Sequence, residues 1–267
     1  MSTCLVTATR NLVPGDQAGF TMVHFLSEKF FLAVFLLIVL TNFVHAGSFS
    51  VTPLRIELSK SESTRIINLQ NLESKPVTVQ LYVMAWSHKD GSDLYTPTRD
   101  VIVTPQIFHL RANGLQIIRA GLLRKPDVSE ELSYRLFIEE IPEPPASDFK
   151  GVQLALKISL PIFVAPEKTS PSSLEFHTEI QQDGKLKLKI VNTSQTHAQI
   201  QKLAVFTQEK DQKSIAVYEK SLYVLPRQER NILIKTDTRD LSGNEKFLIR
   251  AITRTGQVES YANAGPP

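Results

Sequence analysis

The side chains able to act as general acids, nucleophiles or metal ligands form no recognisable catalytic pattern in this sequence. Four histidines follow residue 46: His88, His109, His177 and His197. None lies at a paired spacing such as HxH or HExxH, so we predict no metal site. No GxSxG turn and no glycine-rich phosphate loop occurs, and the adjacent Glu139 and Glu140 would point to opposite faces of a strand. We therefore expect no catalytic residue, no cofactor and no enzymatic activity.

A row of alternating apolar residues between Gly151 and Pro166 is the other feature of this sequence that could serve a function. The apolar residues occupy every even position: Val152, Leu154, Leu156, Ile158, Leu160, Ile162 and Val164. Because successive side chains of a strand point to opposite faces, the pattern predicts one long β-strand over residues 151–166. Such a row suits the core of a β-sandwich, and it equally suits an exposed row that completes the sheet of another protein.

An unbroken apolar run at residues 30–40 indicates a secretory signal peptide. Lys29 precedes the run, and Val44-His45-Ala46 ends with a small residue at the expected cleavage point. The run is shorter than the roughly 20 apolar residues that span a membrane, so we expect no stable membrane insertion after cleavage. We assign residues 1–46 to the signal peptide, and Met22 is an alternative start that would give a leader of ordinary length.

Composition, charge and cysteine content narrow the class of the exported chain. The 267 residues are 42% hydrophobic, which is enough to bury a substantial core. The net charge of +3 does not indicate a nucleic-acid partner. The only cysteine, Cys4, precedes the apolar run of the leader, so the exported chain has no disulfide. This favours two packed sandwiches over a small cross-linked module.

Short apolar segments separated by turn residues follow the leader. In the first half we expect strands at Phe49–Leu58, Arg65–Leu69, Val77–Trp86, Val101–Thr104, Ile107–Leu110, Gln116–Ala120 and Tyr134–Ile141. In the second half we expect them at Leu174–Ile180, Lys185–Val191, Ile200–Gln208, Ile215–Tyr218, Leu222–Leu225, Asn231–Lys235 and Lys246–Thr253. This spacing predicts an all-β protein of two immunoglobulin-like sandwiches, residues 47–166 and 167–267, with the Pro/Ser-rich segment Pro166–Ser173 as their linker.

Two further patterns indicate structural roles. Lys185, Lys187 and Lys189 alternate with apolar residues, which is typical of a strand with one solvated face. Trp86 ends an apolar strand, and we expect it in the core.

The order of these segments resembles the periplasmic chaperones of chaperone–usher pili. The likeness covers residues 49–166 and rests on several short motifs in one order. The motifs are TPLRIEL around Arg55, Asn68-Leu69-Gln70-Asn71 with Lys75-Pro76, Ala85-Trp86, Val103-Thr104-Pro105-Gln106 with Arg119, Phe137–Pro142, and Leu154-Ala155-Leu156 with Pro166. In the second half, Tyr261–Gly265 resembles the terminal turn of the family.

The resemblance implies two immunoglobulin-like domains set in an L, with a cleft between them. Such a chaperone supplies the strand that a pilus subunit lacks, so that its backbone extends the subunit's sheet and alternate side chains fill the groove. The residues carried over as donors are Val152, Leu154 and Leu156, with Ile158 extending the row. Leu160 and Ile162 are expected to face the chaperone's own core.

The resemblance also implies that Arg55 holds the C-terminal carboxylate of the subunit. A guanidinium is a planar fork that fits two carboxylate oxygens, and this contact would fix the register of the added strand. The family's usual second anchor is a lysine, but this chain has Pro161 there, which predicts a break in the ladder near residue 161. Either Arg55 acts with another base, for which Lys157 and Arg119 are the candidates, or other contacts fix the register. Ala165 stands where relatives often carry an arginine, which predicts an altered charge network between the domains.

The resemblance thus implies a periplasmic, non-enzymatic chaperone that binds pilus or fimbrial subunits and delivers them to an outer-membrane usher. One alternative is an immunoglobulin-like exported adhesin or structural pilus protein, which would have a single incomplete domain after a polar N-terminal extension. A second alternative is an exported carbohydrate-binding or hydrolytic β protein. That protein would need clustered exposed aromatic residues or paired carboxylates.

Overall fold

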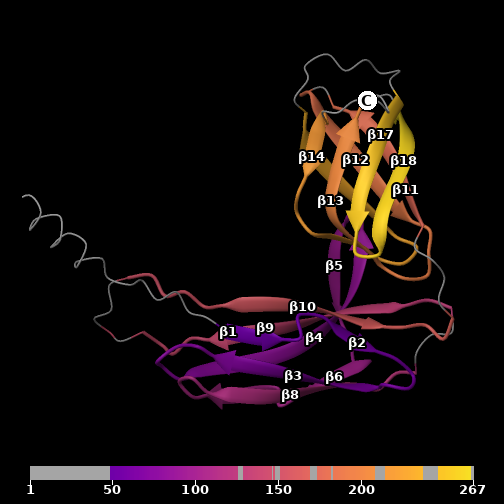
Figure 1. The fold of residues 1–267 in the computed structure, drawn as a ribbon. Coiled ribbons are helices and arrows are strands. Elements are labelled where there is room, and N and C mark those ends of the chain that lie inside the picture. The colour runs from indigo at the N-terminus through magenta and orange to yellow at the C-terminus, as the bar shows by residue number, and fades with distance from the viewer. Residues whose placement is uncertain are drawn as a thin grey trace, which may run out of the picture. The chain divides into compact units, whose positions relative to one another are not determined.

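The computed structural model describes residues 49–125, 129–145, 147, 151–168, 173–181, 183–207, 214–236 and 246–265. The regular elements of these residues are β-strands (Figure 1), and none of the described residues forms a helix long and apolar enough to cross a membrane. The expected signal peptide at residues 1–46, the alternative start at Met22 and residues 169–172 of the expected linker lie outside the described residues.

The first half of the chain forms two sheets over one core. Its strands are β1 (Phe49–Thr52), β2 (Ile56–Leu58), β3 (Thr64–Asn71), β4 (Val77–Lys89), β5 (Ser92–Pro97), β6 (Val101–Thr104), β7 (Ile107–Leu110), β8 (Leu115–Leu122), β9 (Leu132–Ile141) and β10 (Lys157–Val164). One sheet has the order β1-β3-β8-β6, and the other has the order β2-β10-β9-β4-β5 with β7 also paired to β4. Ile67 and Ile118 of one sheet share a buried cluster with Leu136 and Ile162 of the other, as expected for a sandwich.

The second half forms one continuous sheet that folds over its own core. Its strands are β11 (Leu174–Ile180), β12 (Lys185–Asn192), β13 (Ala198–Phe206), β14 (Ala216–Tyr218), β15 (Leu222–Val224), β16 (Glu229–Lys235), β17 (Lys246–Thr253) and β18 (Gly256–Gly265). The order is β14-β13-β17-β18-β11-β12-β16, with β15 paired to β13. Leu188 of β12 and Val205 of β13 belong to one buried cluster although their strands are distant in this order. The predicted all-β fold of two immunoglobulin-like sandwiches is confirmed.

Alternation of side chains explains how the individual strands form. In β12, Leu186, Leu188 and Ile190 are fully buried, whereas the intervening lysines are partly exposed. Lys187 lies 2.8 Å from the carboxylate of Glu179 on the neighbouring strand. The prediction of a solvated lysine face is therefore confirmed.

The segment Phe49–Leu58 forms two strands instead of the single strand expected. β1 ends at Thr52 and pairs with β3, whereas β2 begins at Ile56 and pairs with β10 in the other sheet. Pro53 lies between them and has no N–H to donate to a ladder, so the chain can leave one sheet here and join the other.

Two strands have no clear signal in the sequence. β5 is exposed along its whole length and therefore lacks the alternation of a half-buried strand, and β18 is largely polar. The expected terminal turn at Tyr261–Gly265 is wrong, because these residues are part of β18, which pairs with β17. Each of the other expected strands agrees with the structure to within three residues at each end, apart from the segment that contains β10.

The expected long strand over residues 151–166 is shorter in the structure, where β10 covers Lys157–Val164. The Glu140 N–H donates to the Leu156 carbonyl at 2.9 Å, but the Leu156 N–H donates to the Oε2 atom of Glu140 at 3.2 Å. The side chain of Glu140 thus takes the place of its own carbonyl, and regular pairing with β9 ends at this point.

Candidate functional site

The apolar row predicted to be donated passes from solvent into the core of the first sandwich. Val152 and Leu154 are 84% and 83% exposed, Leu156 and Ile158 are partly buried, and Leu160 and Ile162 are 4% and 0% exposed. Ile158 packs against the first sandwich's own core, so the freely exposed part of the row ends before it. The prediction that Leu160 and Ile162 face this core is confirmed.

One backbone edge of β10 is open over its first half. Glu140 donates its N–H to Leu156, and hydrogen-bonded pairs alternate with non-hydrogen-bonded pairs along an antiparallel ladder. The even residues of β10 therefore bond to β9, and its odd residues direct their N–H and C=O groups to the other edge. β2 covers that other edge only from Ile162 to Val164. Among the described residues, no strand pairs with the edge at residues 157–161.

Pro161 lies at the end of this open edge. Its register partner on β9 is Arg135, at a non-hydrogen-bonded position of the ladder. The nitrogen of Pro161 therefore faces away from β9, and β10 continues unbroken to Val164. The predicted break near residue 161 is wrong because the proline occupies the orientation in which a ladder loses no hydrogen bond.

Arg55 immediately precedes β2, and the parallel register of β2 with β10 places it beside Pro161. The Arg55 side chain is 24% exposed, and its Nε lies 2.9 Å from Oε1 of Glu57. With Arg65, both residues line a hollow of about 460 Å³. The sheet thus places a partly enclosed guanidinium where the open edge of β10 ends.

The two auxiliary bases expected from the sequence lie in different places. Lys157 is the first residue of β10, with its Nζ 3.7 Å from Oε2 of Glu139. A hydrogen bond with Tyr82 and the charge of Glu139 raise the pKa of Lys157 above its ordinary value. Arg119 lies on β8, in the other sheet, with its side chain exposed. The structure therefore does not bring Arg119 to Arg55.

Arg135 is a basic residue that the sequence reasoning missed. Its guanidinium carbon lies 3.8 Å from the centre of the Trp86 ring and 5.6 Å from that of Tyr223. Its Nε is buried and has no hydrogen-bond partner among the described residues. Burial lowers the pKa of Arg135, although the neighbouring Asp93 acts in the opposite direction. A charged residue between two core-facing residues of β9 is the signal that could have found it.

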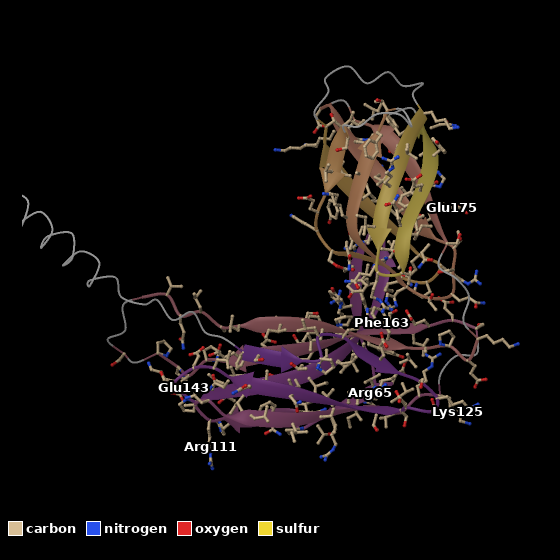
Figure 2. All side chains as sticks on the ribbon, viewed as in Figure 1. Arg65, Arg111, Lys125, Glu143, Phe163 and Glu175 are labelled. Carbon is tan, nitrogen blue, oxygen red and sulfur yellow. The ribbon has the colours of Figure 1, made fainter. Side chains whose placement is uncertain are left out.

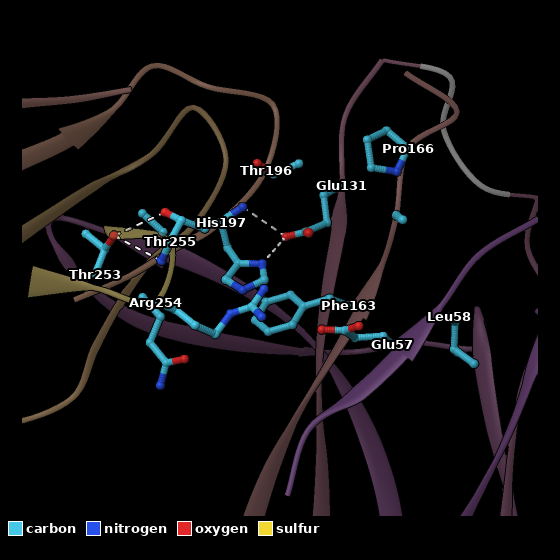
Figure 3. Close-up of a pocket in the computed structure, with 13 residues that line it drawn as sticks. Glu57, Leu58, Glu131, Phe163, Pro166, Thr196, His197, Thr253, Arg254 and Thr255 are labelled. Carbon is cyan, nitrogen blue, oxygen red and sulfur yellow. Dashed lines mark hydrogen bonds and ion pairs between the residues drawn. The ribbon is translucent and has the colours of Figure 1, made fainter. Parts of the chain in front are cut away.

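A cavity of about 560 Å³ lies beside β2 and β10 (Figure 3), and its lining includes Glu57, Leu58, Glu131, Phe163, His197 and Arg254. The carboxylate of Glu131 accepts a hydrogen bond from the His197 backbone N–H at 3.1 Å and lies 2.7 Å from Nδ1 of the same residue. The imidazole stacks on Phe163, a β10 residue labelled in Figure 2, with ring centres 3.6 Å apart. Glu131 of the first sandwich and His197 of the second thus form a buried acid–imidazole pair. Ala165, where relatives often carry an arginine, contributes no charge to this pair.

Asp93 is the centre of a second polar cluster. It accepts a hydrogen bond from the Trp86 indole N–H at 2.8 Å and lies 2.9 Å from Nη1 of Arg230 and 3.4 Å from Nε2 of His88. Burial by itself would raise the pKa of Asp93, but the neighbouring His88, the hydrogen bond from Trp86 and the charge of Arg230 hold it well below its ordinary value. Trp86 is 4% exposed, so its predicted core position is confirmed.

Three aromatic rings of the first sandwich, on β4, β5 and β9, lie close together. Tyr82 stacks on Phe137 with ring centres 5.1 Å apart, and Tyr95 meets Phe137 edge to face at 5.4 Å. These rings therefore pack on one another. The described residues contain no group of three or more histidine, cysteine, aspartate or glutamate side chains that could hold a metal ion.

Comparison with known proteins identifies the first sandwich. The sequence matches the family described as pili and flagellar-assembly chaperone, PapD N-terminal domain, over residues 48–170. A search of curated protein sequences finds no match.

Solved structures share the fold over both sandwiches. A chain of the CsuC–CsuE chaperone–tip adhesion subunit pre-assembly complex of Acinetobacter baumannii is 20% identical, with a TM-score of 0.60 over 81% of this chain and 99% of that chain. The Salmonella enterica SafA pilin–SafB chaperone complex gives 18% identity and a TM-score of 0.54 over 82% and 97%. The E. coli chaperone DraB gives 19% identity and a TM-score of 0.51 over 81% and 99%. Residues 48–170 thus match the N-terminal domain of the pili and flagellar-assembly chaperones, and the solved structures share the fold of both sandwiches.

Proposed function

We propose that this protein is a pilus-assembly chaperone that lends the strand segment from Val152 to Ile158 to a fimbrial subunit. The observation that carries the proposal is the row of apolar side chains that is open to solvent at Val152 and Leu154 and enters the protein's own core at Leu160. A foreign sheet added to this segment would continue the core of the first sandwich into a second molecule.

Burial of the exposed residues supplies the driving force for this association. Moving one such side chain out of water stabilises by roughly 1.5–3 kcal/mol. Val152, Leu154 and Leu156 together therefore contribute several kcal/mol before the ordering of both partners is subtracted. Ile158 already packs on its own core, so its contribution is the smallest of the row.

The open backbone edge of β10 determines where a bound subunit strand would end. A subunit strand would form its ladder with the odd residues of β10 and stop where Pro161 offers no N–H. Its C-terminal carboxylate would then lie beside Arg55, which offers a fork for two oxygens. Arg135 faces Pro161 across the ladder and is better placed than Lys157 or Arg119 to add a second positive charge.

The expected leader and the match to a pilus-chaperone domain support a periplasmic setting. Cleavage of residues 1–46 would release the chain into the periplasm, where it would pass its subunit to an outer-membrane usher. Two of the similar structures contain a chaperone with a subunit, a tip adhesion subunit in one and a pilin in the other, which supports a subunit as the partner. The mechanism needs no cofactor, no catalytic residue and no nucleic acid.

Co-expression with candidate fimbrial subunits, followed by a pull-down, tests the proposal. The unaltered chain should retain a subunit, and Arg55→Ala should lose most of it. Arg111→Ala, which removes an exposed arginine at a turn of the same sandwich, is the matched control and should retain it. Equal recovery with Arg55→Ala and Arg111→Ala would contradict the assigned role of Arg55.

A further inference from the structure

The Arg55 guanidinium is already held from one side. Among the described residues, the one group within ion-pairing distance of it is the carboxylate of Glu57, which meets Nε at 2.9 Å. The two residues are separated by Ile56, which is 1% exposed, so both side chains leave β2 on the face opposite the core. Glu57 itself is open, with its side chain 56% exposed.

The geometry of a guanidinium gives this contact a consequence. The group has five N–H donors in one plane, with Nε on one edge and the two terminal nitrogens at the far end. A carboxylate on Nε leaves the far end available for a second carboxylate, which can bind there through two parallel hydrogen bonds. A side chain held in this way loses less conformational freedom when the second carboxylate arrives.

The backbone of Glu57 is held by its neighbours. Its backbone carbonyl accepts a hydrogen bond from Nε of Arg65 at 2.9 Å, and Arg65 also pairs with Glu62. The β2–β10 register places Glu57 opposite Phe163, whose side chain is 2% exposed. The orientation of Arg55 is thus tied to the sheet through Glu57.

We propose that Glu57 is a positioning residue of the carboxylate anchor: it holds Arg55 by Nε and presents the other end of the fork to the C-terminus of the bound strand. This inference rests on the proposed function, because it presumes that Arg55 binds a carboxylate. In a competing role, Glu57 would occupy Arg55 and the incoming carboxylate would have to displace it. This competing role predicts that Glu57→Ala increases the preference for a carboxylate, whereas the positioning role predicts that it decreases it.

The test compares two forms of one probe. The probe is a synthetic peptide of alternating valine and threonine residues that ends in a free carboxylate, and its reference is the same peptide with a C-terminal amide. The measured quantity is the ratio of the two affinities, for the unaltered chain, Glu57→Gln, Glu57→Ala, Arg55→Ala and the control Glu175→Ala, an exposed carboxylate on β11. Circular dichroism of each variant checks that it folds.

The unaltered chain and the control should prefer the free carboxylate by about tenfold or more, which corresponds to one charge-assisted hydrogen-bonded pair. Glu57→Gln keeps an oxygen for Nε and removes a repelling charge, so its preference should equal or exceed that value. Glu57→Ala should lose most of the preference, and Arg55→Ala should have none.

Two outcomes separate this inference from the function on which it rests. A preference in Glu57→Ala that equals or exceeds that of the unaltered chain overturns the positioning role, and an increase in both Glu57 variants would identify a competitor. If the unaltered chain does not prefer the free carboxylate, the carboxylate anchor at Arg55 itself is wrong.

Discussion

Pro161 faces Arg135 across the β9–β10 ladder at a position where the two residues exchange no hydrogen bond. The proline therefore costs the first sandwich nothing on its β9 side, and its missing N–H lies on the open edge of β10. Pro161 was expected to break the strand. It instead marks where the ladder with a subunit strand would end, beside the guanidinium of Arg55.

The exposed apolar row predicts a selective loss of subunit binding. Leu154→Glu places a charge in the centre of the segment that a subunit would bury, whereas the free protein already exposes Leu154 to water. We expect subunit affinity to fall by at least one to two orders of magnitude, as the loss of 1.5–3 kcal/mol requires, with no change in the melting temperature.

Leu115→Glu is the matched control for this change, because Leu115 is 60% exposed on β8 in the other sheet. A pull-down with co-expressed subunits, together with thermal unfolding of both variants, makes the measurement. Equal losses in the two variants would mean that exposed apolar residues bind subunits without regard to position, and the donor assignment would fail.

The basic residues Arg55, Lys157 and Arg119 should differ in how much they contribute to subunit binding. Arg119→Ala should leave subunit recovery unchanged, because Arg119 lies on the sheet that does not contain β10. Lys157→Ala should have a small effect, because Lys157 is paired with Glu139 at the far end of β10 from Pro161. The same pull-down with Arg55→Ala as reference ranks the three variants, and a loss with Arg119→Ala as large as with Arg55→Ala would refute this ranking.

Asp93 should make the stability of the protein depend on pH. Its pKa is lowered on folding from the ordinary 3.8, so the charged form stabilises the native state above that pH, and this contribution is lost as the pH falls below it. Asp93→Asn should lower the free energy of unfolding at neutral pH by about 1–3 kcal/mol, the cost of leaving charged and buried donors unpaired. Urea titrations at several pH values test this. A difference between the two proteins that stays constant from neutral pH to well below 3.8 would contradict it.

The Glu131–His197 pair should also stabilise the fold. Glu131→Ala leaves the His197 N–H buried without an acceptor, so we expect a loss of about 1–3 kcal/mol in the free energy of unfolding. Glu131→Gln keeps an oxygen for this N–H and should lose less. Glu219→Ala removes an exposed carboxylate and is the control, with no measurable change expected. Equal stability of Glu131→Ala and the control would show that the pair contributes nothing.

Local patterns were sufficient to predict most of the strands. Alternation located β12 and the core-facing half of β10 because one side of each strand is buried. The same signal failed for β5, whose side chains are all exposed, and for the start of β10, where the carboxylate of Glu140 takes a hydrogen bond that the ladder would have used. Such contacts depend on residues brought together by the fold.

The candidate site could be predicted only in part. Alternation located the apolar row, whereas its donor role and Arg55 came from the resemblance. The placement of Arg55 near one end of an open edge depends on the β2–β10 register. Arg135 and Glu57 were missed, because each acquires its partners across strands. The pair of Asp93 with Arg230 joins residues 137 positions apart, which no local pattern encodes.

Amide hydrogen exchange along β10 tests the central claim most directly. The N–H groups of Lys157 and Ser159 face the open edge, whereas those of Ile158 and Leu160 bond to β9. In the free protein the N–H groups of Lys157 and Ser159 should exchange fast and those of Ile158 and Leu160 slowly. In the complex with a co-expressed fimbrial subunit all four should exchange slowly. If Lys157 and Ser159 are protected in the free protein, or stay unprotected when a subunit is bound, no foreign strand completes this edge.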